Sequence, residues 1–474
     1  MTEGHRFPRP GLLEAAAAIH VTALLIGVSW AFGGNASWVR MPISVAATIG
    51  ILISLAAVAR AESRSRIPKG TLGWALPILA LNALVLLSCL SPGFKDMAYG
   101  GDLFLMPLRM PWWRPSAARP VLALQELWLF DGIYFSCFNL VLLVQSRTLL
   151  RAIVAVVVAN TLVLSIFGSV QKLVGSTGIY FGSIKSPQDY FFASFVYDNH
   201  WASFVILTLA ACVGLTLRYV GRGSTGGPFH GPALLGLIVT FLIAITVPLS
   251  GARACTLLVC VLMVVALVRG APKLLHAMRA SELPKPVSML LLALAVGTVT
   301  WGAWSIAGDV VQRRVSKARA QLTTIWSQGG LGSRSALYHD TWRMAHDRVL
   351  FGWGMGSFPS VFSLYNTQVS PIDRIPVVYH DAHSDWLQCL AELGFAGAIL
   401  IAAAIIMPAV SLRGERLSSV PYFLLAGCIL VGAYALIEFP FGNVAVALAW
   451  CLCYACALQY RRLSRPPPRP TPHP

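Results

Sequence analysis

Long apolar runs, separated by short polar segments, fill most of the chain. Many of them hold about 18 or more residues, enough for a helix rising about 1.5 Å per residue to cross a hydrocarbon core about 30 Å thick. The pattern predicts about twelve membrane-spanning helices, at 12–32, 42–58, 72–90, 122–144, 153–173, 202–220, 233–249, 255–268, 287–306, 395–410, 422–438 and 444–460.

These spans predict an all-α polytopic membrane protein in four parts. Residues 1–307 hold the first nine spans with short loops, and 308–393 form a large outward loop with amphipathic helices. Residues 394–460 hold the last three spans, and 461–474 form a basic, proline-rich tail that we expect to be disordered in the cytoplasm. The first run has no clear small-residue cleavage site, so we interpret it as an uncleaved helix.

Composition excludes a soluble fold. Of the 474 residues, 56% are hydrophobic and 12% are charged, against about 25% charged in an ordinary soluble domain. The net charge of +17 would also suit nucleic acid, so the placement of the positive residues decides. With both termini in the cytoplasm, the inner segments hold 20 of the 36 lysines and arginines. This distribution favours membrane lipid and no nucleic-acid partner.

The ten cysteines predict neither a disulfide framework nor a metal site. Most lie inside apolar runs, and Cys451, Cys453 and Cys456 have no acidic or histidine neighbours in sequence, so we assign them to helix packing. Asp381, His383 and Asp385 are an alternative cation site, but no second ligand cluster accompanies them. We therefore predict no metal and no cofactor.

The longest outward segment carries candidate chemistry. Its length of about 85 residues exceeds what a connector needs, and it is rich in arginine, histidine and aromatic residues. Ser333 is placed to cap a helix over 334–347. The alternate glycines Gly352, Gly354 and Gly356 suit either a helix-ending turn or a close approach to a ligand, and we favour the turn.

Two further residues lie where apolar spans meet water. His383 precedes a helix that enters the tenth span, and a helix N-terminus favours a neutral imidazole that accepts a proton. It is also a simple capping candidate. Arg253 lies in a short outward turn, where a diphosphate would compensate the cost of desolvating the arginine. Snorkelling to lipid headgroups is its alternative role.

Four segments resemble the O-antigen ligase and polymerase superfamily of bacterial membrane glycosyltransferases. They are FVYDNHWASFVILTLA at 195–210, PLSGARACTL at 248–257, SRSALYHDTWRMAHDRVLFGWGMGSF at 333–358 and AHSDWLQCLAELGFAGAIL at 382–400. Their order and their placement relative to the spans are similar to the family pattern. The chain departs from it at Ser384 and Tyr197, where the family often has asparagine.

The resemblance implies a GT-C-like fold in the bacterial inner membrane, with a cavity and a long loop facing the periplasm. It implies a metal-independent, inverting transfer of a glycan from undecaprenyl diphosphate. Carried over to this chain, the functional set is Arg253 and Arg334, which hold the diphosphate, and His383, which deprotonates the acceptor. The predicted substrate-binding residues are Asn199, His200, Lys172, Arg343 and Asp385.

Two other functions remain open at this point. A secondary transporter also suits a dozen spans with both termini inside, although ionisable residues then usually lie near the midplane. A non-catalytic subunit for polysaccharide assembly would use the long loop only for docking. For an enzyme, the acceptor is a lipid A core sugar, a growing glycan or a protein hydroxyl, and the sequence does not distinguish these.

Overall fold

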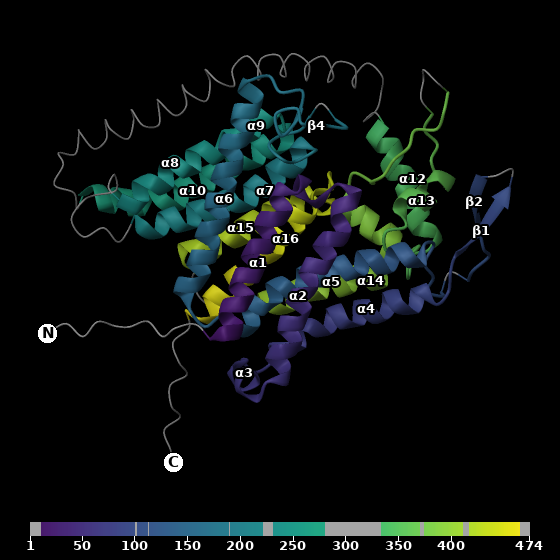
Figure 1. Cartoon of the computed structure of the whole chain (residues 1–474), viewed down its shortest axis with the longest axis horizontal. Coiled ribbons are helices and arrows are strands. Elements are labelled where there is room, and N and C mark those ends of the chain that lie inside the picture. The colour runs from purple at the N-terminus through teal and green to yellow at the C-terminus, as the bar shows by residue number, and fades with distance from the viewer. Residues whose placement is uncertain are drawn as a thin grey trace.

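Helices make up most of the protein (Figure 1). The computed structural model describes residues 11–99, 102–111, 113–188, 190–220, 231–279, 333–369, 374–410 and 417–464. The helices in the first half of the chain are α1 (Leu12–Trp30), α2 (Ser37–Ala59), α3 (Ala61–Arg66), α4 (Leu76–Cys89), α5 (Pro120–Leu143), α6 (Arg147–Leu173) and α7 (Asp198–Tyr219). Those that follow are α8 (Gly231–Ala244), α9 (Thr246–Ser250), α10 (Arg253–Arg279), α12 (Ser333–Asp347), α13 (Phe358–Val361), α14 (Asp385–Val410), α15 (Ser419–Tyr434) and α16 (Val444–Arg462).

Within the described residues, ten helices are long and apolar enough to cross a membrane. They coincide with ten of the predicted spans, and the shorter apolar helix α15 coincides with an eleventh. The predicted ninth span, 287–306, lies outside the described residues, so the count of twelve and the full extent of the outward loop stay predictions. The multi-pass membrane architecture is confirmed.

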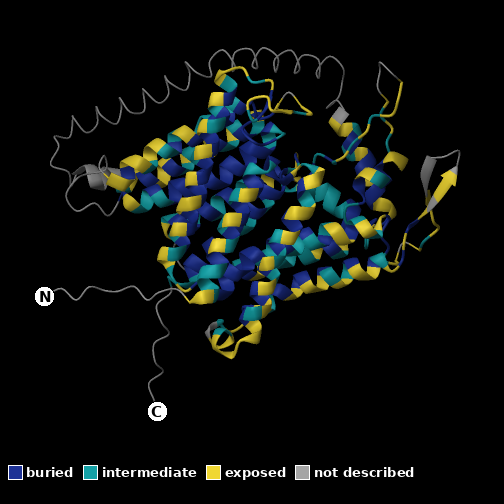
Figure 2. Cartoon of the chain, in the orientation of Figure 1, coloured by how far each residue is buried: buried dark blue, intermediate teal, exposed yellow. Residues whose placement is uncertain are grey.

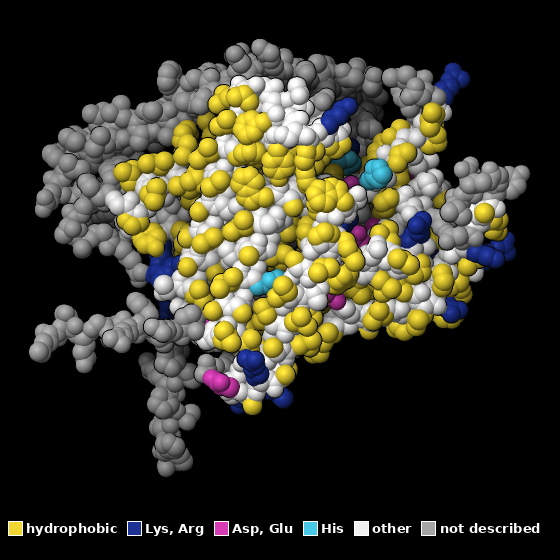
Figure 3. Space-filling model, in the orientation of Figure 1, with side chains coloured by type: hydrophobic (Ala, Val, Ile, Leu, Met, Phe, Trp, Pro, Cys, Tyr) yellow, Lys and Arg dark blue, Asp and Glu magenta, His cyan; other side chains and the backbone are white. Residues whose placement is uncertain are grey.

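Apolar side chains cover the outer faces of the spans (Figures 2 and 3). On the face drawn in Figure 3, lysines and arginines lie mainly near the rim of this apolar surface. Such a surface would aggregate in water, because monomeric soluble proteins rarely expose contiguous apolar patches of this extent. The exposed apolar residues of the spans include Ile19, Leu52, Leu87, Leu257 and Ile429.

Helix α7 lies at the centre of the bundle. Of its most apolar window, 89% is buried inside the protein, and α7 packs against α6, α8, α10, α15 and α16. Elsewhere, small residues allow close helix packing, as where Gly132 of α5 faces Ala47 of α2. The cysteines also serve helix packing, since Cys453 and Cys456 are buried within α16 and every described cysteine is free.

Side-chain contacts identify the two ends of the bundle. At one end, the Gln145 amide donates to Glu14 Oε1 over 3.0 Å, and Arg218 donates to the Tyr460 hydroxyl over 2.8 Å. Lys273 of α10 also bonds there to the last turn of α7 and the first residue of α15. The start of α1 and the end of α16 therefore lie together, whereas α7, α10, α14 and α16 begin at the opposite end (Figure 1).

Helix α14 is broken at Gly394, whose φ of 62° and ψ of −171° are not helical. The segment after α12 fills the break with backbone hydrogen bonds. Trp353 and Gly354 donate to the carbonyls of Ala391 and Glu392, while residues 395 and 396 donate to the carbonyls of residues 349 and 350. The predicted glycine turn is thus a backbone bracket that joins the end of α12 to the middle of α14.

Two short hairpins correct the all-α prediction for the outward segments. Strands β1 (Phe94–Tyr99) and β2 (Asp102–Pro107) pair antiparallel, with Phe94 opposite Pro107. Strands β3 (Gly178–Ile179) and β4 (Ile184–Lys185) form a smaller antiparallel pair. Both follow the ends of spans, where an extended chain satisfies its backbone groups without a long helix.

Substitution Gly352→Ala is expected to destabilise the protein. Gly352 has φ +65°, and a β-carbon there would lie 2.4 Å from the Glu392 carbonyl oxygen. The strained backbone alone costs about 1–3 kcal/mol, and the backbone contact adds to that cost. The fraction of purified protein that stays monodisperse after heating measures the effect. The control Gly27→Ala adds a β-carbon with nothing within 4 Å, and equal heat resistance in both variants would contradict the bracket.

Candidate functional site

The segment between α15 and α16 carries a buried carboxylate, Glu438, whose side chain is only 4% exposed. Three side chains donate to it from distant parts of the chain. Arg334 of α12 reaches Oε1 at 2.5 Å, Asn199 of α7 reaches Oε1 at 3.3 Å, and Nδ1 of His383 lies 3.3 Å from Oε2. A buried carboxylate is costly unless it is paired in this way. We call these four residues the Glu438 cluster.

Tyr338 fixes the position of His383 relative to α12. It lies one helical turn after Arg334, and its hydroxyl is 2.9 Å from the His383 carbonyl oxygen and 3.3 Å from that of Ile437. His383 itself has φ 49°, a left-handed conformation that is uncommon outside glycine. Strained backbone of this kind persists only where surrounding contacts determine it, and it concentrates at functional sites.

The imidazole of His383 has a defined orientation. With Nδ1 donating its hydrogen to the Glu438 carboxylate, Nε2 carries the lone pair and accepts hydrogen bonds or protons. The His383 side chain is 28% exposed and that of Arg334 is 47% exposed, so the cluster opens to its surroundings on the side of these two residues. The buried acid thus holds a partly exposed histidine and a partly exposed arginine.

Aromatic contacts hold the loop that carries Glu438. The Phe439 ring stacks on Tyr197 with centroids 5.6 Å apart, and it meets the rings of His200 at 5.0 Å and His383 at 4.8 Å edge-on. Nε2 of the buried His200 also lies 3.2 Å from the Phe439 carbonyl oxygen. These contacts keep the carboxylate of Glu438 under Arg334 and His383.

Asp385, the first residue of α14, ties the same loop from the other side. Its Oδ2 accepts the Phe441 amide at 2.8 Å, and its own amide donates to the Glu438 carbonyl at 3.2 Å. The side-chain carboxylate and the backbone amide of Asp385 therefore both position the α15–α16 loop. Within the described residues, no group of three or more His, Cys, Asp or Glu side chains is arranged to hold a metal ion.

The electrostatics of the cluster favour an ionised Glu438. Burial raises the pKa of this carboxyl, but the hydrogen bond from His383 and the positive charge of Arg334 lower it by more, so its pKa lies below the usual value. Burial and then the Glu438 charge raise the pKa of the Tyr197 hydroxyl, which therefore stays protonated. A fixed negative charge beneath Arg334 and His383 follows.

Five of the eight predicted site residues meet around this loop. Arg334, His383 and Asn199 contact the Glu438 carboxylate, and His200 and Asp385 contact the backbone of the following residues. The other three residues lie elsewhere. Lys172, at the end of α6, lies 4.9 Å from the centre of the Phe191 ring. Arg343 projects from the face of α12 opposite Arg334, since nine residues make two and a half turns.

Arg253 is the first residue of α10, and its side chain is exposed. Two residues later, Cys255 Sγ lies 4.0 Å from Ser203 Oγ, and Ser203 Oγ in turn donates to the Asn199 carbonyl. Arg253 therefore lies at the same end of the bundle as the Glu438 cluster. A turn with Gly251 at φ 102° directs the chain into α10 at this point.

The sequence prediction missed the residues at the centre, namely Glu438, Tyr338 and Phe439. Glu438 was visible as an acid at the end of an apolar run, followed by Pro440 and Gly442 in a tight turn. An ionisable residue at such a position is a functional candidate. Neither its partners nor the convergence of α7, α12 and α14 on it follows from local sequence.

Residues 238–402 match the family model described as O-antigen ligase. The matched part includes Arg253, Arg334 and His383. Over these residues the chain is similar to the O-antigen ligase family. The resemblance predicted from the motifs is thereby confirmed, and the protein is a multi-pass membrane protein with an O-antigen ligase-like domain. The search of curated proteins found no match. Asn199 and Glu438 lie outside the matched residues, so the domain and its flanks build the cluster together.

Substitution Glu438→Gln is expected to change how the stability of the O-antigen ligase-like protein depends on pH. Because the folded pKa of Glu438 is lowered, its stabilisation is present above the unfolded carboxyl pKa of about 4.3 and is lost as pH falls through the folded value. Thermal unfolding of detergent-solubilised wild type should therefore weaken at acid pH more than that of the variant. Glu14→Gln, at the other end of the bundle, is the control, and equal acid sensitivity of wild type and Glu438→Gln would contradict this assignment.

Proposed function

We propose that this protein is a membrane glycosyltransferase that transfers or polymerises a glycan carried on undecaprenyl diphosphate, at the periplasmic face of the bacterial inner membrane. The observation that carries the proposal is the Glu438 cluster, in which one buried carboxylate holds a partly exposed arginine and a partly exposed histidine. A transfer from a diphosphate needs these two groups, a cation for the leaving group and a base for the acceptor.

Arg334 is suited to the diphosphate of the donor. A guanidinium has five N–H donors, and one of those of Arg334 bonds to the buried carboxylate of Glu438. The remaining donors lie on a side chain that is 47% exposed, where they can bind phosphate oxygens bidentately. Arg253, at the start of α10 on the same end of the bundle, is the second proposed arginine for the diphosphate.

His383 is the proposed general base. The acceptor hydroxyl attacks the anomeric carbon from the face opposite the diphosphate, and its proton moves to Nε2 of His383. The new carbon–oxygen bond forms as the bond to the diphosphate breaks, the electron pair leaves with the diphosphate, and the anomeric configuration inverts. Arg334 and Arg253 stabilise the charge on the leaving group, so the proposed mechanism requires no divalent cation.

Glu438 acts as a positioning residue in this mechanism. By accepting the hydrogen of Nδ1, the carboxylate fixes the tautomer that leaves Nε2 free, and it stabilises the imidazolium formed after proton transfer. It also sets the place of the Arg334 guanidinium. Asn199 and Tyr338 support the same geometry through Glu438 and the His383 backbone.

The distribution of charge supports the proposed orientation in the membrane. Arg147, Arg151 and Arg218 belong to the end of the bundle where the first and last helices meet, opposite the Glu438 cluster. Arg60 and Lys69 flank α3 at the same end. Positive residues near span ends favour the cytoplasm, so the cluster would face the periplasm, where the polyprenyl tail stays in lipid and the diphosphate lies at the interface.

Substitution of the cluster residues is expected to lower the rate of transfer to different degrees. His383→Ala should lower the rate at least about 100-fold, and Arg334→Ala about 100- to 1,000-fold. Arg334→Lys should be almost as damaging, because lysine does not bind bidentately. Glu438→Gln should lower the rate about 10- to 100-fold by loosening the histidine. The measurement is transfer from an undecaprenyl-diphosphate glycan in membranes containing a chelator of divalent cations.

The control for this series is Arg109→Ala, because Arg109 is an exposed arginine on the segment between β2 and α5, away from the cluster. It should retain wild-type transfer. Full activity in the His383, Arg334 and Glu438 variants would remove the proposed active site. If the chelator stops transfer by the wild type and magnesium restores it, the metal-independent mechanism is wrong. The protein would then be a metal-dependent glycosyltransferase.

Reporter insertions are expected to separate the two faces of the membrane. Alkaline phosphatase inserted after Leu108 should be active, because this exposed segment lies at the end of the bundle that carries the cluster. Inserted after Lys69, next to α3, it should be inactive. The reverse pattern, measured at matched expression, would place the cluster in the cytoplasm and exclude a periplasmic transfer.

A further inference from the structure

One stripe of side chains leads away from the Glu438 cluster along α12. Arg334, Tyr338, Trp342 and His346 follow one another at intervals of four residues, so each lies beside the next on the helix surface. Arg334, Trp342 and His346 are exposed, and Tyr338 is half-buried. Buried Leu337, Met344 and Ala345 occupy the adjoining face and fix the helix to the core. The stripe is therefore an accessible surface that begins at the proposed reaction centre.

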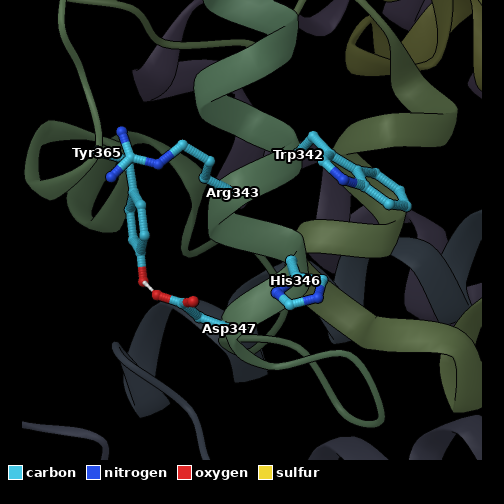
Figure 4. Close-up of a pocket in the computed structure, with 5 residues that line it drawn as sticks. All are labelled: Trp342, Arg343, His346, Asp347 and Tyr365. Atoms are coloured by element: carbon cyan, nitrogen blue, oxygen red, sulfur yellow. Dashed lines mark hydrogen bonds between the residues drawn. The ribbon is translucent and has the colours of Figure 1, made fainter.

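The stripe ends at a surface pocket of about 310 Å³ lined by Trp342, Arg343, His346, Asp347 and Tyr365 (Figure 4). In Figure 4, Trp342 and Arg343 project to different sides of α12, and the Tyr365 ring faces the helix from the segment after α13. The Tyr365 hydroxyl donates to Asp347 Oδ2 over 2.6 Å, which holds both side chains in place. The pocket thus combines two aromatic rings with groups of both charges.

This combination suits a neutral, hydroxyl-rich ligand. A pyranose ring presents an apolar C–H face, which packs on an exposed aromatic ring such as Trp342, and it presents hydroxyl groups at its edge. Arg343 supplies donors for those hydroxyls, and Asp347 supplies acceptors. A phosphate would suit Arg343 but would be repelled by Asp347, so the pocket differs in chemistry from the arginine centre at Arg334.

We propose that the stripe and the pocket form a saccharide-binding track for the part of the glycan several sugars away from the reacting bond. This inference rests on the proposed glycosyltransferase function, because the track begins at Arg334. Along the helix axis, Arg334 and Trp342 of the stripe are separated by about 12 Å at 1.5 Å per residue, a distance that a short oligosaccharide spans. The track selects glycan chains by length.

A lipid interface is the competing occupant, because half-exposed tryptophan also occurs at headgroup level. Two observations favour the saccharide. Asp347 lies in the pocket, where an anionic headgroup would meet it, and Tyr365 donates to that acid rather than to solvent. Headgroup binding would instead favour positive residues without a carboxylate.

Binding to the full-length protein in lipid nanodiscs tests the track directly. The probe is soluble glycan, released by mild acid from the lipid-linked pool of the native host and fractionated by length. The fluorescence emission of Trp342 is obtained by subtracting the spectrum of Trp342→Phe from that of the wild type. Binding of glycan should change this emission. Affinity should fall about tenfold in Trp342→Ala, while the control Trp113→Ala, at a tryptophan 60% exposed outside the track, should bind as wild type does.

Three results would overturn the track. The first is that wild type and Trp342→Ala bind glycan with equal affinity. The second is that Trp113→Ala loses as much glycan affinity as Trp342→Ala does. The third is that brominated lipid quenches the Trp342 emission and glycan does not change this quenching. The last result would assign α12 to the lipid interface. Because Trp342→Ala itself could disturb folding, Trp342→Phe serves as a second variant, which keeps a ring and should retain most of the affinity.

Transfer assays separate this inference from the proposed function. With long-chain donors, Trp342→Ala should raise KM about tenfold at unchanged kcat, and with a donor carrying one repeat unit it should behave as wild type. Binding through Trp342 without any transfer by wild type would reject the glycosyltransferase and keep the saccharide site. If Arg334→Ala lowers transfer, but Trp342→Ala affects long and short donors equally, the track is wrong and the proposed enzyme stands.

Discussion

A single buried carboxylate governs the arrangement of this end of the protein. Glu438 lies where an apolar bundle meets water, and its charge is tolerated only because Arg334, His383 and Asn199 converge on it. These donors come from α12, from the segment before α14 and from α7, which are far apart in the chain. The requirement to satisfy one acid thus brings together the segments that make the site.

The spans were predictable because lipid imposes a length and an apolar composition on each of them, and eleven of the twelve predicted segments coincide with described helices. Arg334 and His383 were found through motifs of a known family. Their partner Glu438 was not found in this way. A single acid near the end of a span does not reveal its contacts in the local sequence, and Glu14 lies in a similar position. Lys172 and Arg343 were grouped with the others by sequence, yet the fold places them apart.

The glycine motif after α12 was predicted only in part from the sequence, because its turn is local and its pairing with α14 is not. A turn after α12 was expected at Gly352, Gly354 and Gly356, and a turn is present. Its use in the break of α14 depends on backbone groups around Gly394, about forty residues later. Long-range pairing of this kind leaves no periodic trace, because the glycines are selected by the approach of another backbone.

The bracket at the break of α14 has a mechanical consequence. Residues 349–354 join the end of α12 to α14 through four backbone hydrogen bonds, so the helix bearing Arg334 and the helix that follows His383 form one unit. Glu438 lies on the connection between α15 and α16, which Asp385 of α14 ties to this unit through two hydrogen bonds. A displacement of this unit would therefore move the arginine, the histidine and the acid as one rigid group.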